Sequence, residues 1–119
     1  MEDYKLGVME TRFANLIWEH APVLSGELVK LCEKEFDWKK STTYTMLRRL
    51  CNKGIFQNIS GVVSSLLSKD ELQALQSERF IQESFNGSLP KFLAAFSLRS
   101  KLSDSEIDAL QNIIDQHKE

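Results

Sequence analysis

The sequence has 119 residues, of which 42% are hydrophobic and 27% are charged, and it contains only two prolines and five glycines. This composition excludes disordered and collagen-like chains, and the length excludes a large multi-domain enzyme. No run of about 18 apolar residues could cross a membrane, and no basic stretch leads into an apolar one at the N-terminus. We therefore expect a compact cytoplasmic protein that does not insert into membranes.

The formal net charge of −2 is unevenly distributed along the chain. Residues 1–36 carry a net charge of −3, residues 37–69 carry +5 and residues 70–119 carry −4. A basic segment between acidic ones is typical of a protein in which one element faces a polyanion. Charge alone is explained more simply by a solvated basic helix face, so the interpretation depends on where the basic side chains lie.

Two short amphipathic helices are predicted in the first 36 residues. Apolar residues recur at intervals of three and four between Val8 and His20, and Ala21-Pro22 should end this helix. Ser25 is expected to cap the second helix, because serine accepts hydrogen bonds from exposed amides at a helix start. The buried stripe of the second helix consists of Leu28, Val29, Leu31 and Cys32.

A third helix is predicted from the cap-type residues Ser41-Thr42-Thr43 to about Lys53, where Gly54 occupies the position of a helix-ending glycine. Its inward side consists of Thr43, Met46, Leu47 and Leu50. Its opposite side consists of Ser41, Tyr44, Thr45, Arg48 and Asn52. Hydroxyl, amide and guanidinium groups can address base edges in a major groove. Two short helices followed by a polar-faced third helix predict a helix-turn-helix.

Basic residues flank this polar side. We expect Lys39 and Lys40 to hold phosphates together with the helix dipole. Arg48 and Arg49 lie about 100° apart around the helix; we expect Arg48 to face the groove, and Arg49 to face phosphate or an acidic residue of its own chain. The predicted DNA-binding residues are Lys39, Lys40, Ser41, Thr42, Tyr44, Thr45, Arg48, Arg49 and Asn52.

A small β-hairpin is predicted after the third helix. The stretch 57–63, Gln-Asn-Ile-Ser-Gly-Val-Val, places a turn signal between β-branched residues, which is typical of the wing of a winged helix. No charged residue occurs between Lys53 and Lys69. The hairpin therefore cannot clamp phosphates electrostatically, although its backbone amides could contact them.

The second half is predicted to contain three helices that form a dimer. Ser68 and Ser103 each begin an S-x-x-E capping box, and three helices in about 50 residues rarely close a stable core alone. Pairing with a second copy would bury their apolar residues; the alternative is that they fold back onto the same chain. The expected dimerisation residues are Leu89, Phe92, Leu93, Phe96, Ile107, Leu110, Ile113 and Ile114. We expect a DNA-binding domain at 1–69 and a dimerisation region at 70–119.

Residues 38–56, WKKSTTYTMLRRLCNKGIF, resemble the penicillinase repressor family of bacterial regulators, whose pattern is close to W-x-x-S/K-T-V-x-T-x-L-x-R-L-x-x-K-G. Glu10 and Leu16-Ile17-Trp18 are similar to the opening helix of that family. The resemblance implies a mainly α winged-helix repressor that binds a two-fold symmetric operator as a homodimer and is released by an inducing signal. It also implies a longer, basic and aromatic wing, from which this chain departs.

Two further features of the family concern release from DNA. In the branch that controls β-lactam resistance, a membrane-linked sensor protease cuts an Asn-Phe bond, and the matching pair here is Ala95-Phe96. The resemblance thus marks this pair for proteolytic inactivation and the protease as a partner. Copper-responsive members carry a C-terminal cysteine cluster, and no cysteine follows Cys51, which excludes copper sensing through that cluster.

No set of residues in the sequence indicates an enzyme, a metal site or a cofactor. His20 and His117 are far apart in sequence, so a helix-end role for His20 is favoured over a metal role. Trp38 is expected to be a buried anchor and not a residue that stacks on a base. The sequence therefore predicts a sequence-specific transcriptional repressor, and the alternative is a winged helix that binds other proteins and never contacts DNA.

Overall fold

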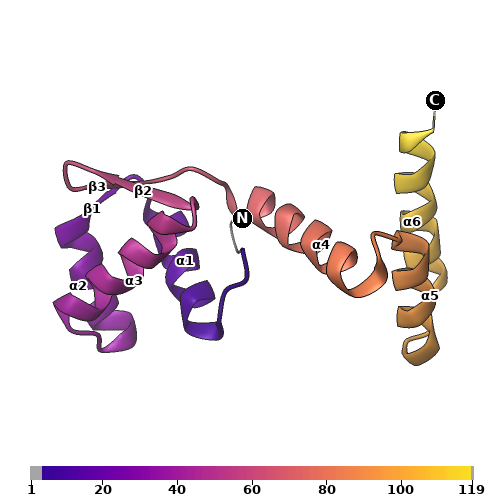
Figure 1. Ribbon diagram of the computed structural model, residues 1–119, viewed down its shortest axis with the longest axis horizontal. Coiled ribbons are helices and arrows are strands. Elements are labelled where there is room, and N and C mark those ends of the chain that lie inside the picture. The colour runs from indigo at the N-terminus through magenta and orange to yellow at the C-terminus, as the bar shows by residue number, and fades with distance from the viewer. Residues whose placement is uncertain (1–3, 119) are drawn as a thin grey trace. The chain divides into compact units, whose positions relative to one another are not determined.

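The computed structural model describes residues 4–118, which fall into two compact units, one within residues 1–77 and the other within residues 78–119 (Figure 1). In chain order the elements are α1 (Val8–His20), β1 (Val23–Leu24), α2 (Ser25–Phe36), α3 (Lys40–Asn52), β2 (Phe56–Ile59), β3 (Val62–Ser65), α4 (Lys69–Phe85), α5 (Leu89–Arg99) and α6 (Asp104–His117). The prediction of a mainly α winged helix-turn-helix is confirmed. Helix α4 begins in the first unit and ends in the second.

The core of the first unit is formed by one side of each of the first three helices and by the sheet. Phe13 and Ile17 of α1, Leu28 of α2, Leu50 of α3 and Phe56 of β2 are fully buried. Phe13 and Ile17 are four residues apart, a spacing that places two side chains on the same face of a helix. The buried side of α3 is thereby fixed against α1 and α2, which leaves its other side toward solvent.

The wing is the hairpin of β2 and β3, to which β1 adds a third strand that the sequence did not predict. The strand order is β1-β3-β2, and both pairs are antiparallel. Ser60 and Gly61 form the two-residue turn, with φ of 51° and 83°, and such turns match the right-handed twist of hairpins. The predicted hairpin is confirmed.

Two expected helix starts differ from the structure. Ser25 is the first residue of α2, and Leu24 stands at the capping position without a side-chain cap. The Ser25 amide instead donates a hydrogen bond to the Gly61 carbonyl across 2.8 Å, so the pairing of β1 with the wing replaces the serine cap. Helix α3 starts at Lys40, which places Ser41 within its first turn. Its predicted end is confirmed, since Gly54 follows with φ of 79°.

Trp38 anchors the segment between α2 and α3. Its ring centroid lies 5.3 Å from that of Phe13 in α1 and 4.8 Å from that of Phe36 at the end of α2. The side chain is half-buried against the core. Trp38 is a packing anchor, as the sequence predicts, although its side chain is half-buried where a buried one was expected.

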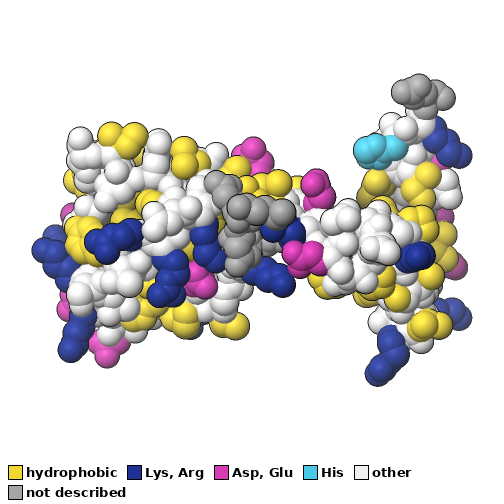
Figure 2. Space-filling model, in the orientation of Figure 1, with side chains coloured by type: hydrophobic (Ala, Val, Ile, Leu, Met, Phe, Trp, Pro, Cys, Tyr) yellow, Lys and Arg dark blue, Asp and Glu magenta, His cyan; other side chains and the backbone are white. Residues whose placement is uncertain are grey.

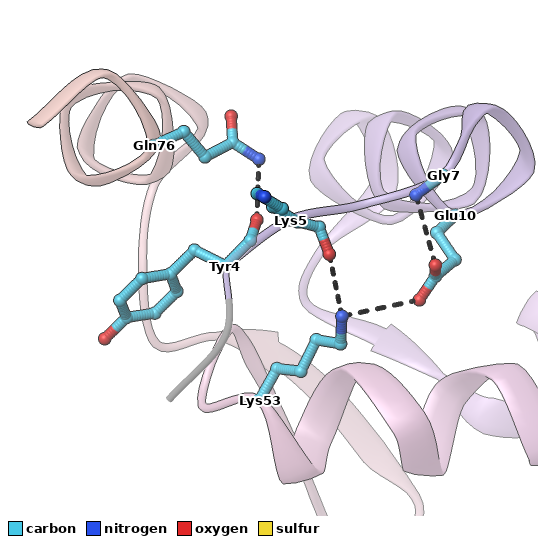
Figure 3. Close-up of polar contacts among 6 residues, drawn as sticks. All are labelled: Tyr4, Lys5, Gly7, Glu10, Lys53 and Gln76. Carbon is cyan, nitrogen blue, oxygen red and sulfur yellow. Dashed lines mark hydrogen bonds and ion pairs between the residues drawn. The ribbon is translucent and has the colours of Figure 1, made fainter. Parts of the chain in front are cut away.

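The segment before α1 joins three helices of the first unit through polar contacts (Figure 3). The Lys53 ammonium donates to the Lys5 carbonyl across 2.7 Å and lies 3.9 Å from the Glu10 carboxylate. Glu10 in turn accepts a hydrogen bond from the Gly7 amide. On the other side, the Gln76 side chain of α4 donates to the Tyr4 carbonyl across 2.8 Å. The first half of α4 is therefore part of the winged-helix unit.

The second unit consists of the end of α4 with α5 and α6. The rings of Phe80, Phe85, Phe92 and Phe96 are in contact along α4 and α5, with centroid distances of 5.5 to 6.2 Å. Both predicted capping boxes are present: Ser68 exchanges hydrogen bonds with Glu71, and Ser103 with Glu106. Within the described part of this unit, none of the side chains is fully buried.

Candidate nucleic-acid interface

Helix α3 has a polar outer side. Two lysines lie at its start: Lys39 precedes the helix, and Lys40 is its first residue. Thr43, Leu47 and Leu50 hold the helix from behind, because all three are buried. We define the α3 surface as the exposed residues Lys39, Lys40, Ser41, Thr42, Thr45, Arg48, Arg49 and Asn52. The structure therefore brings eight of the nine predicted DNA-binding residues together as exposed side chains on α3 and the residue before it.

The ninth residue, Tyr44, lies at the margin of this surface and is half-buried. Its hydroxyl donates a hydrogen bond to the Ser25 hydroxyl across 3.2 Å, and the Ser25 amide is bound to the Gly61 carbonyl of the wing turn. Tyr44 therefore connects α3 to the start of α2 and, through Ser25, to the wing. Sequence reasoning missed this role of Ser25, because its capping pattern also fits a helix start.

A hollow of about 210 Å³ separates α3 from the wing, lined by Tyr44, Leu47, Arg48, Cys51 and Asn58. Asn58 of β2 is exposed and pairs in register with Val63 of β3, which is buried. Directly paired residues share a face of the sheet, so Asn58 lies on the face that is turned toward the helices. The sequence analysis did not select Asn58. Side chains alternate between the two faces of a strand, and this alternation predicts the face on which Asn58 lies.

The α3 surface carries four positive charges, those of Lys39, Lys40, Arg48 and Arg49. Across residues 4–118, Lys39, Lys40, Arg48 and Arg49 make no ion pair, whereas Lys53 is bound to Glu10. Figure 2 shows lysine and arginine side chains spread over the viewer's side of the first unit. Four unpaired cations beside hydroxyl and amide groups can bind phosphates and base edges.

The two thiols of the first unit have packing roles. Cys32 is buried in α2, and Cys51 is half-buried in α3. Burial raises the pKa of both thiols, an effect that the Thr43 hydroxyl partly offsets at Cys32. A raised pKa keeps a thiol protonated and therefore weakly nucleophilic. Cys32 lies on the buried side of α2, as the sequence predicts.

A family model for the penicillinase repressor matches residues 6–116 of the chain. The chain belongs to the penicillinase repressor family. This is a family of regulators and not of enzymes. The chain is 28% identical over 122 residues to the penicillinase repressor of Bacillus licheniformis, a match that covers 99% of this chain and 91% of the relative. It is 25% identical over 117 residues to the methicillin resistance regulatory protein MecI of Staphylococcus aureus strain Mu50, with 95% of each chain covered.

The residues expected to dimerise this family member are distributed over α5 and α6. Leu89, Phe96, Ile107, Ile113 and Ile114 are exposed, with exposed fractions between 45% and 62%. Phe92, Leu93 and Leu110 are half-buried. An apolar groove of about 320 Å³ runs between the two helices, lined by Phe92, Leu93, Phe96, Leu102, Glu106, Ala109, Leu110 and Ile113. The groove offers a surface that a second chain could cover.

The Ala95-Phe96 pair lies within α5, and the Phe96 carbonyl accepts a hydrogen bond from the Ser100 amide that follows the helix. His20 Nδ1 is hydrogen-bonded to the Leu16 carbonyl across 3.0 Å at the end of α1, as expected of a helix-end residue. Between residues 4 and 118 there is no cluster of three metal-ligating side chains, and none of the helices is long and apolar enough to span a membrane.

Proposed function

We propose that this chain is a homodimeric transcriptional repressor that binds a two-fold symmetric DNA operator through its α3 surface. The observation that carries the proposal is the combination of a firmly buried inner side of α3 with an exposed outer side of hydroxyl, amide and unpaired cationic groups. The buried side fixes the helix, and the exposed side is free to enter a major groove. The names of the two relatives, a penicillinase repressor and a methicillin resistance regulatory protein, support this proposal.

Within the α3 surface, the middle of the outer side is the part that should reach base edges. Ser41, Thr45 and Asn52 lie within a narrow arc around the helix axis. Their hydroxyl and amide groups can donate to and accept from bases, and the threonine methyl can contact a thymine methyl. Lys39 and Lys40 lie at the N-terminal end of the helix, where they can hold phosphates.

A second copy of the chain is the proposed partner for the apolar groove of the second unit. Exposed aliphatic and aromatic side chains on both helices would be removed from water in such a dimer. A dimer also supplies the two-fold axis that a symmetric operator requires. The two copies of α3 would then lie about 34 Å apart in successive major grooves. A monomer would lose most of the specific affinity.

The competing function is a winged helix that binds other proteins only. The uncharged wing favours it, because residues 54–68 contain no lysine or arginine. The two functions differ in their response to salt. Binding to phosphates releases counterions and weakens steeply as salt rises, whereas binding between uncharged surfaces does not.

The test is a gel-shift titration with an operator selected from random-sequence DNA, performed at about 50 and 200 mM salt. If each protomer uses its four unpaired cations on phosphates, the logarithm of the affinity should fall with the logarithm of salt with a slope of about −7 for the dimer. Lys39→Gln with Lys40→Gln should make this slope shallower. Lys101→Gln, in the second unit, is the matched control and should leave it unchanged. Absence of salt-dependent DNA binding would reject the repressor function.

A further inference from the structure

We propose that the hollow between α3 and β2 is a seat for one phosphate of the operator backbone, held by Arg48 and Asn58. The inference rests on the proposed function and specifies how the wing side of the α3 surface meets DNA. It reassigns Arg48 from base reading, which the sequence favoured, to backbone binding, and it gives the uncharged wing a contact with DNA.

Arg48 lies on one flank of the α3 surface. A helix that lies in a major groove directs the middle of its outer side at the bases, while its two flanks face the phosphates of the groove walls. Arg48 and Arg49 lie on opposite flanks of the arc centred on Asn52 and Thr45. The flank that carries Arg48 is the one that lines the hollow together with the wing strand. Arg48 therefore faces the wall where β2 approaches the DNA backbone.

Arg48 and Asn58 supply hydrogen-bond donors at the hollow. Within the described part of the chain, neither the Arg48 guanidinium nor the side-chain amide of Asn58 is bound to another residue. The neighbouring Tyr44 hydroxyl already donates a hydrogen bond to the Ser25 hydroxyl, and the Gln57 side chain of β2 donates to the Ser64 hydroxyl across 3.0 Å. The free donors at this place are thus a guanidinium, which matches phosphate geometry bidentately, and an amide.

The hollow has room for a phosphate group. Leu47, which is buried, and the half-buried, protonated Cys51 thiol form its apolar floor. The exposed side chains at its rim are Arg48, from α3, and Asn58, from β2. Its volume of about 210 Å³ is several times the roughly 30 Å³ that one water molecule takes up in the liquid. The Tyr44 hydroxyl is hydrogen-bonded to Ser25, and the Ser25 amide to the Gly61 carbonyl, so α3 and the wing turn are connected on both sides of the hollow.

The experiment measures the affinity and salt slope of the full-length protein for its selected operator and for a random duplex. Asn58→Asp places a negative charge at the rim, and Ile59→Asp places the same charge on the next residue, which is 61% exposed and lies on the opposite face of the sheet. Arg48→Gln removes the charge at the rim, and Arg48→Lys retains it. Circular dichroism and thermal melting confirm that each variant is folded.

The seat predicts that Asn58→Asp and Arg48→Gln each weaken binding to both duplexes by about tenfold or more, with base preference unchanged. Arg48→Gln should also make the salt slope shallower by about 0.9 for each seat, and Arg48→Lys should restore it. Ile59→Asp should have a much smaller effect than Asn58→Asp. Replacing the one backbone phosphate that occupies the seat by an uncharged methylphosphonate should cause the same loss of affinity in the unmodified protein. The replacement should cause no further loss in Arg48→Gln.

Two results would overturn the seat while leaving the repressor function intact. The first is a relaxed preference at one base pair in Arg48→Gln with an unchanged salt slope, which would make Arg48 a base reader. The second is an equal effect of Asn58→Asp and Ile59→Asp. If the unmodified protein shows no salt-dependent DNA binding, the proposed function fails, and the seat fails with it.

Discussion

Glu10 and Lys53 connect the first turn of α1 to the residue that ends α3, with 3.9 Å between carboxylate Oε2 and ammonium Nζ (Figure 3). Both side chains are largely buried, with exposed fractions of 17% and 20%. Lys53→Met removes the cation and leaves the Glu10 carboxylate without its partner. We expect the free energy of unfolding to fall by about 1 to 3 kcal/mol, measured by urea denaturation.

A double-mutant cycle with Glu10→Gln isolates the interaction between the two charges. The amide can still accept the Gly7 hydrogen bond, so Glu10→Gln changes the charge and little else. The double variant should lose less stability than the sum of the single variants. Additive losses would show that Lys53 acts through the Lys5 carbonyl alone.

The capping boxes at Ser68 and Ser103 predict a loss of stability in acid. Hydrogen bonds from the Ser68 backbone amide, and then from its hydroxyl, lower the pKa of Glu71, and Ser103 does the same for Glu106. The pKa of such a carboxylate is lower in the folded state than in the unfolded state, where it is about 4.3. Its contribution to stability is therefore complete above the unfolded pKa and is lost as the pH falls through the folded pKa.

A carboxyl NMR titration measures both values in one sample. Ser68→Ala should return the pKa of Glu71 toward its ordinary value while that of Glu106 stays low, because the two boxes lie in different helices. Glu71→Gln should keep the cap and remove its share of the pH dependence. An unchanged pKa of Glu71 in Ser68→Ala would contradict the assigned cause.

Thr45 lies in the middle of the α3 surface and is the residue whose loss should change sequence preference. Thr45→Ala should relax discrimination at one base-pair position by about 1 to 3 kcal/mol while the salt slope remains the same. Competition gel shifts with single-base variants of the operator measure this directly. Unchanged discrimination would remove Thr45 from the set of base-reading residues.

Phe96 lines the apolar groove and is 45% exposed, which makes it the sharpest probe of the proposed dimer. Phe96→Asp would place a charge in the interface and should shift the mass in sedimentation equilibrium from dimer to monomer. Ser97→Asp adds the same charge to the next residue, which is exposed and outside the groove lining, and should leave the mass unchanged. Dimers that survive Phe96→Asp would place the interface elsewhere.

The helices could be predicted from sequence because their signals are local. The apolar residues of α1 repeat at helical spacing, Gly54 ends α3 with a positive φ, and the serine-glutamate boxes start α4 and α6. Strand β1 could not be predicted, since two residues carry no periodicity and its pairing partner lies about 40 positions away. Tertiary pairing also decides the start of α2, where the wing takes the amide of Ser25.

The candidate site, like the fold, could be predicted where the signals are local. Helical periodicity placed Thr45, Arg48 and Asn52 on the exposed side of α3, and the structure has them there. The same periodicity could not show that Tyr44 is half-buried, because the contact with Ser25 joins two helices. Nor could it bring Asn58 beside Arg48, since that proximity depends on how the sheet packs against α3. Their roles in DNA binding remain predictions.

The distribution of aromatic residues makes the two units spectroscopically distinct. Trp18, Trp38 and Tyr44 lie in the first unit, and the aromatic residues within 78–119 are all phenylalanines. Fluorescence excited near 295 nm, where only tryptophan absorbs appreciably, therefore reports on the winged helix alone, while far-ultraviolet dichroism reports helix content throughout the chain. If the dimer dissociates and melts before the winged helix does, the two optical signals will change at different temperatures, and a single label-free sample will resolve the order of events.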